Sequence, residues 1–200
     1  MSLLTYIRSS VLLLVWFSLL LGGGYTVFVT LIAQGVFPHQ ANGSLIEKGG
    51  VIVGSELIGQ QFSDPKYFWG RLSATTPPYN AAHSQGSNMS PANPVLVERV
   101  KERAKMLQEK DPNNIARIPV DLVTASASGL DPHISFAAAM YQVPRVAKLR
   151  KMEQAQLMAL VEKHSDEPLL GFMGQTKVNV LALNIALDEA VIMANPSEKR

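Results

Sequence analysis

The chain has 200 residues, which suits one domain or one modest domain with an appendage. Apolar residues make up 47% of it and charged residues 17%, a low charged fraction for a freely soluble protein. The formal net charge is only +2 and no long basic block occurs, which argues against nucleic acid as a partner. The absence of cysteine excludes disulfides, thiolate catalysis and cysteine-based metal sites.

The apolar residues are concentrated near the N-terminus, where no charged side chain occurs between Arg8 and Glu47. As a helix, residues 11–33 would rise about 34 Å, enough to cross a bilayer core of about 30 Å. The alternative is a cleaved signal peptide, but its apolar region usually has about 7 to 15 residues and ends at a small-residue cleavage pattern. We therefore predict a retained transmembrane helix at 11–33, a short tail at 1–10 and a soluble domain at 34–200.

The charges that flank the predicted span indicate its orientation. Arg8 and the terminal amine precede the span, and Lys48 is the first positive charge after it. The positive-inside bias therefore favours a cytoplasmic N-terminus, because long domains translocate largely regardless of their charge. The expected protein crosses the membrane once and carries its domain outside the cytoplasm.

A glycine triplet, Gly22, Gly23 and Gly24, lies inside the predicted span. Packing drives helix association in lipid, and glycine lets a second helix approach closely. These three glycines are therefore candidate subunit-contact residues. The alternative is a local kink or flexible turn, because consecutive glycines do not form the spaced G-x-x-x-G pattern.

Two segments with little helical pattern follow the span. Residues 51–53 indicate a strand, residues 54–55 a turn, and residues 57–58 the partner strand. Residues 73–94 form a long irregular stretch rich in Ser, Pro, Asn, Gly and Ala. A loop of that length in a compact domain is typically functional or mobile.

Four helices are predicted in the soluble part, which makes it a small α/β or α+β domain. Asn93 and Pro94 are a typical N-cap and first residue of a helix, whereas Pro144 should interrupt a helix or start another. In the third helix, Leu157, Leu160 and Val161 share the inward face. The helices are expected at 93–111, at 136–141, at 152–164, and after an Asn179 cap through Val191.

The run DLVTASASGLDPHIS at 121–135 is the most informative stretch of the chain. Residues 119–123 resemble a short buried strand, and Ser135 is a suitable N-cap for the next helix. Loops between such elements often carry function. The alternative is a packed loop whose hydroxyl groups bond to its own backbone. The candidate residues are Thr124, Ser126, Ser128, Gly129, Asp131 and His133.

Several sequence blocks occur in a fixed order along most of the chain. They are Gly54–Phe62, Tyr67–Ala74, Tyr79-Asn80, Ser84–Asn88 with Asn93-Pro94, the loop Thr124–Ser135, Gln142–Ala147, and Val178–Leu181 with Leu183-Asn184. In this order they resemble the C subunits of bacterial Kdp potassium-transporting ATPases. Leu72 and Gln85 depart from that family's pattern, which usually has proline and glycine there, so the local loop shape is expected to differ.

The resemblance implies an accessory subunit, without a catalytic site, of an ATP-driven high-affinity potassium importer in the bacterial inner membrane. Its partners would be the potassium-translocating and ATP-hydrolysing subunits of the complex, together with membrane lipid. The complex would handle ATP and potassium, and no cofactor is expected on this chain. The family is described as raising the affinity of the pump for ATP.

The residues themselves carry no phosphate-handling motif. Neither G-x-x-x-x-G-K-[ST] nor the Asp-Lys-Thr-Gly sequence of P-type pumps occurs. The basic residues Arg145, Lys148, Arg150 and Lys151 form a scattered basic face, which is not a nucleotide site.

A membrane-anchored envelope hydrolase is the main alternative function. Ser126 or Ser128 would be its nucleophile, His133 its base, and Asp121 or Asp131 the orienting carboxylate. Against this, G-x-S-x-G is absent. The four histidines are widely spaced without an i,i+4 pair, so no metal site is expected. A second alternative is a membrane-anchored ligand-binding adaptor unrelated to transport.

Overall fold

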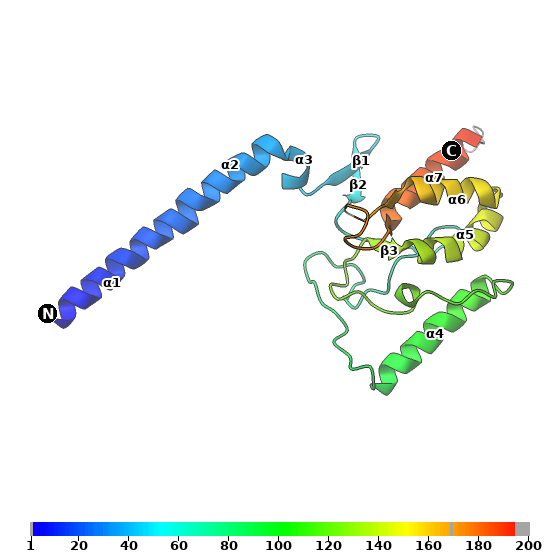
Figure 1. Cartoon of the computed structure of the whole chain (residues 1–200), viewed down its shortest axis with the longest axis horizontal. Helices are drawn as coiled ribbons and strands as arrows, with labels where there is room; N and C mark the ends of the chain where they lie inside the picture. Colours follow the sequence, from blue (N-terminus) through cyan, green and yellow to red (C-terminus); the bar gives the residue numbers. More distant parts are fainter. Residues whose placement is uncertain (1, 169, 195–200) are drawn as a thin grey trace. The chain divides into compact units, whose positions relative to one another are not determined.

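The computed structural model describes residues 2–168 and 170–194. The chain divides into two compact units, with the boundary between Ile46 and Glu47. Unit 1 is almost entirely helical, and unit 2 is a small mixed domain of helices and short strands (Figure 1). The predicted combination of one long apolar helix and one small α/β domain is therefore confirmed.

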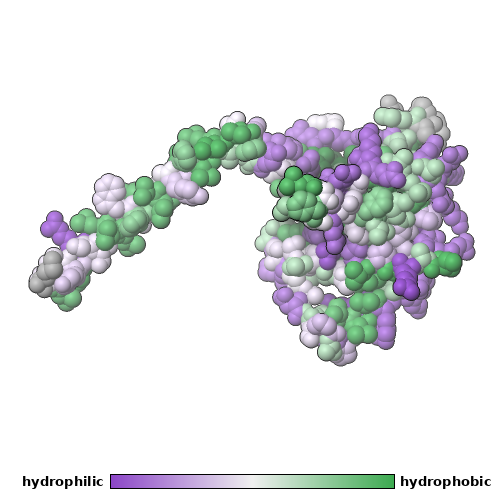
Figure 2. Space-filling model, in the orientation of Figure 1, coloured by the Kyte–Doolittle hydropathy of each residue, from purple (hydrophilic) through white to green (hydrophobic). Residues whose placement is uncertain are grey.

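Unit 1 consists mainly of one continuous helix that is long and apolar enough to cross a membrane, Leu3–Val36. It is built from α1 (Leu3–Phe17), the π-helical stretch η1 (Ser18–Tyr25) and α2 (Thr26–Val36), and none of these elements has a buried residue. Apolar residues cover most of its surface (Figure 2). The short helix α3 (Pro38–Ala41) follows.

The first sheet is a hairpin of β1 (Leu45–Lys48) and β2 (Val51–Ser55). Its turn is Gly49-Gly50, and both glycines have positive φ, as the favoured two-residue hairpin turns require. The prediction that residues 57–58 form the partner strand of residues 51–53 was wrong. The turn at Gly49-Gly50 pairs β2 with the preceding strand, β1, instead. Ile58 makes only an isolated bridge to Ser55.

The second sheet has three short antiparallel strands in the order β3-β5-β4. They are β3 (His133–Ser135), β5 (Lys177–Asn179) and β4 (Ser165–Asp166). Ile134 lies opposite Val178 in the register of β3 and β5, and both side chains are buried. The sheet therefore presents an apolar face to the helices.

Unit 2 has four main helices, and the predicted caps are confirmed. The side chains of Asn93, Ser135 and Asn179 each accept a hydrogen bond from a backbone N–H in the first turn of the helix that follows. Such caps satisfy N–H groups that have no partner within the helix. The helices are α4 (Pro94–Lys110), α5 (Phe136–Arg150), α6 (Gln154–Lys163) and α7 (Val180–Ala194).

Helix α5 continues through Pro144, so the predicted interruption was wrong. Proline removes one helix hydrogen bond and usually breaks or kinks a helix. Here the flanking residues Val143, Val146 and Ala147 are buried in the core. Their burial offsets the missing hydrogen bond and keeps the segment helical.

The predicted strand at 119–123 is instead the short 3-10 helix η2 (Val120–Leu122). Leu122 is completely buried, but the side chain of Val120 is 71% exposed. The apolar residues therefore do not form the short buried strand that the sequence indicated. Asp121, between them, accepts a hydrogen bond from the backbone N–H of Ser135 at 2.7 Å and so ties η2 to the start of α5.

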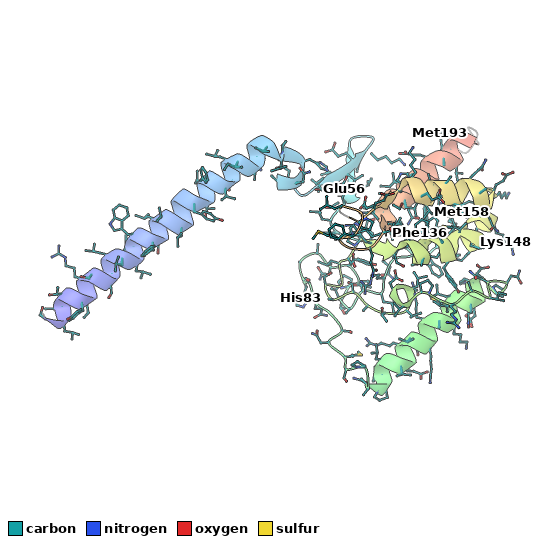
Figure 3. The ribbon with its side chains drawn as sticks, viewed as in Figure 1. Glu56, His83, Phe136, Lys148, Met158 and Met193 are labelled. Carbon is teal, nitrogen blue, oxygen red and sulfur yellow. The ribbon has the colours of Figure 1, made fainter. Side chains whose placement is uncertain are left out.

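The core of unit 2 lies among α5, α6, α7 and the second sheet. The inward positions predicted for α6 are confirmed for Leu157 and Val161, and Leu160 packs at the edge of the core. Helix α4 joins through Leu107. The exposed Lys148 lies on the outward face of α5 (Figure 3). The largest fully buried apolar side chains are Phe68, Leu122, Ile134, Leu157, Leu183 and Leu187.

Candidate functional site

The predicted loop at 124–135 is held on both sides by the irregular segment that precedes α4. The backbone N–H of Ser126 donates to the carbonyl of Leu72 at 3.2 Å, and Leu72 and Ala125 form a parallel bridge. On the other side, the N–H of Gln85 donates to the carbonyl of Ser128 at 2.9 Å. Two sequence blocks far apart along the chain thus form one structure.

The hydroxyl groups of the loop bond to its own backbone. Ser126 is buried, and its Oγ accepts from the N–H of Gly129 at 2.8 Å. The Oγ of Ser128 accepts from the N–H of Leu130 at 3.1 Å, and Thr124 donates to the carbonyl of Val120 at 2.8 Å. Across the described ranges, no hydrogen bond joins either serine to His133. The packed-loop alternative is therefore the one that the geometry supports.

Gly129 is required by its backbone and by its surroundings. Its φ is +69°, a region that side chains rarely adopt. A Cβ there would lie 2.7 Å from Cγ2 of Thr75 and 2.8 Å from the carbonyl oxygen of Gln85. The loop therefore packs tightly against the segment that supports it.

The supporting segment is itself ordered by buried hydrogen bonds. The Ser73 Oγ donates to the Gly129 carbonyl at 2.7 Å and accepts from the N–H of Tyr79 at 2.9 Å. The Tyr79 hydroxyl donates to the carbonyl of Arg71 at 2.7 Å. Burial, together with the nearby charge of Asp131, raises the pKa of Tyr79 to about 12. The first part of the predicted irregular stretch is thus a support for the loop.

Leu72 and Gln85, the two departures from the family pattern, both fit this arrangement. The carbonyl of Leu72 accepts from Ser126, as described above. The Gln85 side chain donates from Nε2 to the carbonyl of Ala74 at 2.8 Å. This bond joins two parts of the irregular segment that supports the loop.

Asp131 and His133 lie together in a charged cluster with Arg71. Nη1 of Arg71 lies 3.1 Å from Oδ2 of Asp131, and Nδ1 of His133 lies 3.5 Å from Oδ1. Burial opposes ionisation of Asp131, but hydrogen bonds from His133 and Arg71 outweigh it and hold the pKa of Asp131 below its usual value. Asp121 accepts from the N–H of Ser135 and lines the same cavity as Arg71, Asp131 and His133. Sequence reasoning missed Arg71, although it stands inside one of the quoted blocks.

Two buried amides join three other sequence blocks. Gln142 accepts from the N–H of Trp69 at 2.8 Å and donates to its carbonyl at 3.0 Å. Asn184 does the same for the adjacent Phe68, with both bonds at 2.9 Å. Each side-chain amide thus acts like a neighbouring strand toward one backbone residue, which satisfies buried groups that would otherwise be unpaired.

Arg145 completes this amide network. It is 3% exposed, lies 4.1 Å from the centre of the Trp69 ring, and donates to Gln142 at 2.7 Å and to the carbonyls of Tyr67 and Pro65. Burial lowers the pKa of Arg145 to about 10, which leaves it charged at neutral pH.

The sequence placed Arg145 on a scattered basic face, and that placement was wrong. Arg145 is buried, and Arg150 pairs with Asp188 at 2.7 Å, so neither offers a free charge on that surface. Only Lys148 and Lys151 of the four are exposed.

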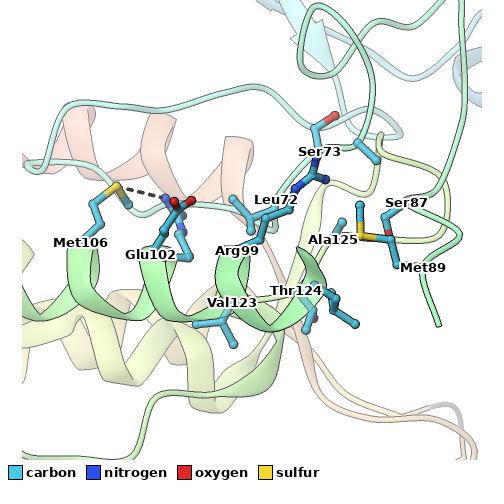
Figure 4. Close-up of a pocket in the computed structure, with 13 residues that line it drawn as sticks. Leu72, Ser73, Ser87, Met89, Arg99, Glu102, Met106, Val123, Thr124 and Ala125 are labelled. Carbon is cyan, nitrogen blue, oxygen red and sulfur yellow. Dashed lines mark hydrogen bonds between the residues drawn. The ribbon is translucent and has the colours of Figure 1, made fainter. Parts of the chain in front are cut away.

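An apolar pocket of about 360 Å³ lies between α4 and the loop (Figure 4). Leu72, Leu96, Met106 and other apolar residues line it, and Arg99, Glu102 and Arg103 contribute charge. Arg103 donates from Nε to the carbonyl of Leu122 at 3.1 Å, and burial lowers its pKa. The pocket has room for an apolar group but lacks a nucleophile paired with a base. No cluster of three His, Asp or Glu side chains suited to a metal occurs in the chain as far as it is described.

The other candidate residues, Gly22, Gly23 and Gly24, lie in η1. A Cβ at Gly22 or Gly23 would meet nothing within 4 Å, and at Gly24 only the carbonyl of Leu19 at 3.9 Å. The three consecutive glycines point in different directions around the helix, and none of them has a packing role in the described part of this chain.

The fold and these sites define a membrane-associated protein with one candidate span and a domain held together by its polar motifs. A family model described as K+-transporting ATPase, c chain (KdpC) matches residues 7–189. The potassium-transporting ATPase KdpC subunit of Herpetosiphon aurantiacus is 58% identical over 92% of this chain and 96% of its own length. Those of Variovorax paradoxus and Ralstonia nicotianae are 56% and 55% identical, over 91% and 92% of this chain and 95% and 90% of their own lengths.

The chain therefore belongs to the KdpC family, whose members are non-catalytic subunits of the potassium-transporting ATPase. This confirms the resemblance carried by the sequence blocks. It also sets aside the hydrolase and the unrelated adaptor, in agreement with serines whose hydroxyl groups are occupied by the backbone.

Proposed function

We infer that this chain is an accessory subunit that helps to assemble or stabilise the Kdp complex. The observation that supports this most directly is the difference between the two units in where their side chains make contacts. The helix Leu3–Val36 buries none of its apolar side chains inside the chain, whereas the polar motifs of unit 2 bond to one another. A helix without internal contacts is suited to lipid and partner helices, and a self-contained domain is suited to support rather than chemistry.

The proposed location is the bacterial inner membrane, with residues 1–10 in the cytoplasm and unit 2 outside it. Arg8 before the span supports this orientation through the positive-inside bias. A reporter enzyme that is active only outside the cytoplasm, fused after Arg200, tests it. We expect full activity, and a reporter that works only in the cytoplasm would reverse the orientation.

The proposed partners are the potassium-translocating and ATP-hydrolysing subunits, which the helix meets within the membrane. The lack of side chains at Gly22, Gly23 and Gly24 supports close helix contact, because a partner backbone would meet no side chain of this chain there. The π-helical geometry of η1 adds support, since such stretches are frequent at functional sites.

The effect on ATP affinity is proposed to be indirect. ATP is supplied in the cytoplasm, where the proposed topology leaves only residues 1–10, and Arg145 and Arg150 are engaged inside unit 2. An accessory subunit changes ATP affinity without touching ATP if it binds two pump states unequally.

Calorimetry on the full chain in mild detergent tests this indirect mechanism. We expect no saturable ATP binding below millimolar concentration. Submillimolar binding that is lost when Lys148 and Lys151 are both changed to Ala would show direct contact with ATP and defeat the indirect mechanism.

A further inference from the structure

The connection between β4 and β5 exposes three large apolar side chains at its tip. Leu170, Phe172 and Met173 are 75%, 76% and 54% exposed. We call residues 170–174 the apolar loop. On the face of unit 2 seen in Figure 2, strongly apolar residues stand among hydrophilic ones. The loop takes no part in the amide network, in the charged cluster or in the pocket beside α4.

The backbone of the apolar loop is held in an unusual shape. Leu170 has a φ of +57°, a region that bulky side chains rarely adopt. Gly171 and Gly174 also have positive φ, and a Cβ at either would meet nothing within 4 Å. A turn hydrogen bond from the N–H of Gly171 to the carbonyl of Pro168 at 2.9 Å supports this shape, which leaves the apolar side chains exposed. Unusual backbone of this kind clusters at functional sites.

The exposed apolar area is small for a protein interface. A single aromatic side chain presents about 150–250 Å², so three side chains provide a few hundred square ångströms at most. A stable protein–protein interface buries about 800 Å² on each partner. The loop is better matched to shallow insertion into a lipid surface, where one or two apolar side chains already make a contact.

A short tether, residues 37–44, joins the helix to the first strand. Only residues 37–44 separate the end of the helix at Val36 from β1 at Leu45. Eight residues span at most about 29 Å when fully extended. Strand β1 therefore begins within about 29 Å of the end of the helix.

The base of the apolar loop lies beside the segment through which the chain enters unit 2. Strand β2 leads directly to Glu56, whose carbonyl accepts from Nδ2 of Asn179 at the end of β5 at 2.8 Å. Leu57 and Lys177 line one shared groove, and Lys177 is the residue at which the loop joins β5. The segment that follows β2 and the base of the apolar loop are thus neighbours within unit 2.

We propose that the apolar loop inserts into the interfacial region of the lipid bilayer, as a second membrane contact of this chain. The proposal rests on the proposed role of the helix as a membrane anchor. Its function is to fix the rotation of unit 2 about the tether, so that the domain meets the partner subunits in one orientation. Lys177 pairs with Asp166 at the loop base at 4.0 Å, and Glu167 next to this pair is exposed. The loop base therefore has no excess positive charge, and the contact does not need anionic lipid.

The lack of cysteine makes a direct test simple. Phe172→Cys in the full chain is labelled with an environment-sensitive fluorophore and placed, without other subunits, in nanodiscs of phosphatidylcholine. The matched control is Lys105→Cys on the exposed face of α4. We expect a blue shift and strong quenching by spin-labelled lipid at position 172, and neither effect at position 105.

A third label, at Leu20→Cys, reports separately on the helix. If this label is quenched by lipid while the label at 172 has the emission of a water-exposed dye, the loop proposal is wrong and the anchor stands. A label at 172 that shifts only after the other Kdp subunits are added would also overturn the proposal, because the loop would then be a protein contact. Absence of lipid quenching at position 20 would refute the anchor itself.

Discussion

In unit 1, the helix Leu3–Val36 leaves its apolar side chains outside any core, whereas unit 2 buries Phe68, Leu122 and Leu183 completely. Most buried polar side-chain atoms of unit 2 have partners within the domain, as in Gln142, Asn184 and Ser126. The exceptions among the described residues are Nε of Arg71 and the hydroxyl of Tyr141. The apolar side chains of unit 1 are therefore available to lipid or to partner helices, whereas the side chains of unit 2 mainly contact one another. Changes in unit 2 should appear as loss of folding stability, and changes in unit 1 as loss of partners.

The largest effect is expected from Gln142→Ala. The variant leaves both backbone groups of Trp69 and one donor of Arg145 without their partner inside the core. Each unsatisfied buried group costs about 1–3 kcal/mol, so we expect a loss of at least about 3 kcal/mol. Denaturant unfolding followed by Trp69 fluorescence, in a Trp16→Phe background, measures it. The exposed Gln108→Ala is the control, and equal stability of the two variants would refute the amide network.

A smaller loss is expected from Gly129→Ala. The new Cβ would meet Thr75 and Gln85 and would hold alanine at positive φ, which together cost about 1–3 kcal/mol. Gly171→Ala is the matched control, because it has positive φ but open space around it. Its loss should be smaller, about 1–2 kcal/mol from the backbone alone. The same denaturant measurement compares the two, and equal losses would show that the loop is not tightly packed.

Ser126→Ala is expected to cost about 1 kcal/mol, because it removes the buried acceptor of the Gly129 N–H. Ser128→Ala, in the same loop but only partly buried, should cost less. Neither variant should change hydrolysis of ester or peptide substrates, which we expect to be absent from the wild-type chain. A hydrolytic activity lost with either serine would contradict this assignment.

The smallest effect concerns acid stability and Asp131. Because the pKa of Asp131 is depressed in the folded protein, its contribution is present above the unfolded pKa of about 3.9 and is lost as the pH falls through the folded value. Melting temperatures measured from pH 5 down to pH 2 should therefore fall less steeply for Asp131→Asn than for the wild type. Parallel curves would show that the ionised cluster with Arg71 adds nothing to stability.

The elements that the sequence predicted well are those with local signals. Asn93, Ser135 and Asn179 are N-caps because a short polar side chain before an apolar pattern suffices to begin a helix. Family membership was also readable, because the ordered blocks run through nearly the whole chain and the family model matches residues 7–189.

The failures arose where tertiary contacts decide the outcome. Pro144 remains inside α5 because neighbouring residues are buried, and no local pattern reveals that burial. The strand at 51–53 pairs with β1 because Gly49-Gly50 forms the turn, which sequence reasoning overlooked.

The candidate site was only partly predictable, for the same reason. The roles of Gln142 and Arg71 depend on partners about 60 to 75 residues away along the chain. The blocks quoted from the sequence contained both residues, and that placement was the only available signal. Of the predicted loop at 124–135, residues 133–135 form strand β3, and the hydroxyl groups of Thr124, Ser126 and Ser128 bond to the local backbone.

The central claim is that the helix of unit 1 binds the partner subunits, whereas the motifs of unit 2 stabilise its own fold. A comparison of Gly23→Ile with Gly35→Ile tests this claim most directly. Both glycines lie in the same helix, and a Cβ at either meets nothing within 4 Å of this chain. The measurement is recovery of the other Kdp subunits with the tagged full chain in mild detergent, alongside the unfolding of unit 2. We predict that Gly23→Ile sharply lowers recovery while Gly35→Ile does not, and that both leave membrane insertion and unfolding unchanged. Undiminished recovery with Gly23→Ile, or a loss of unit 2 stability, would contradict the account.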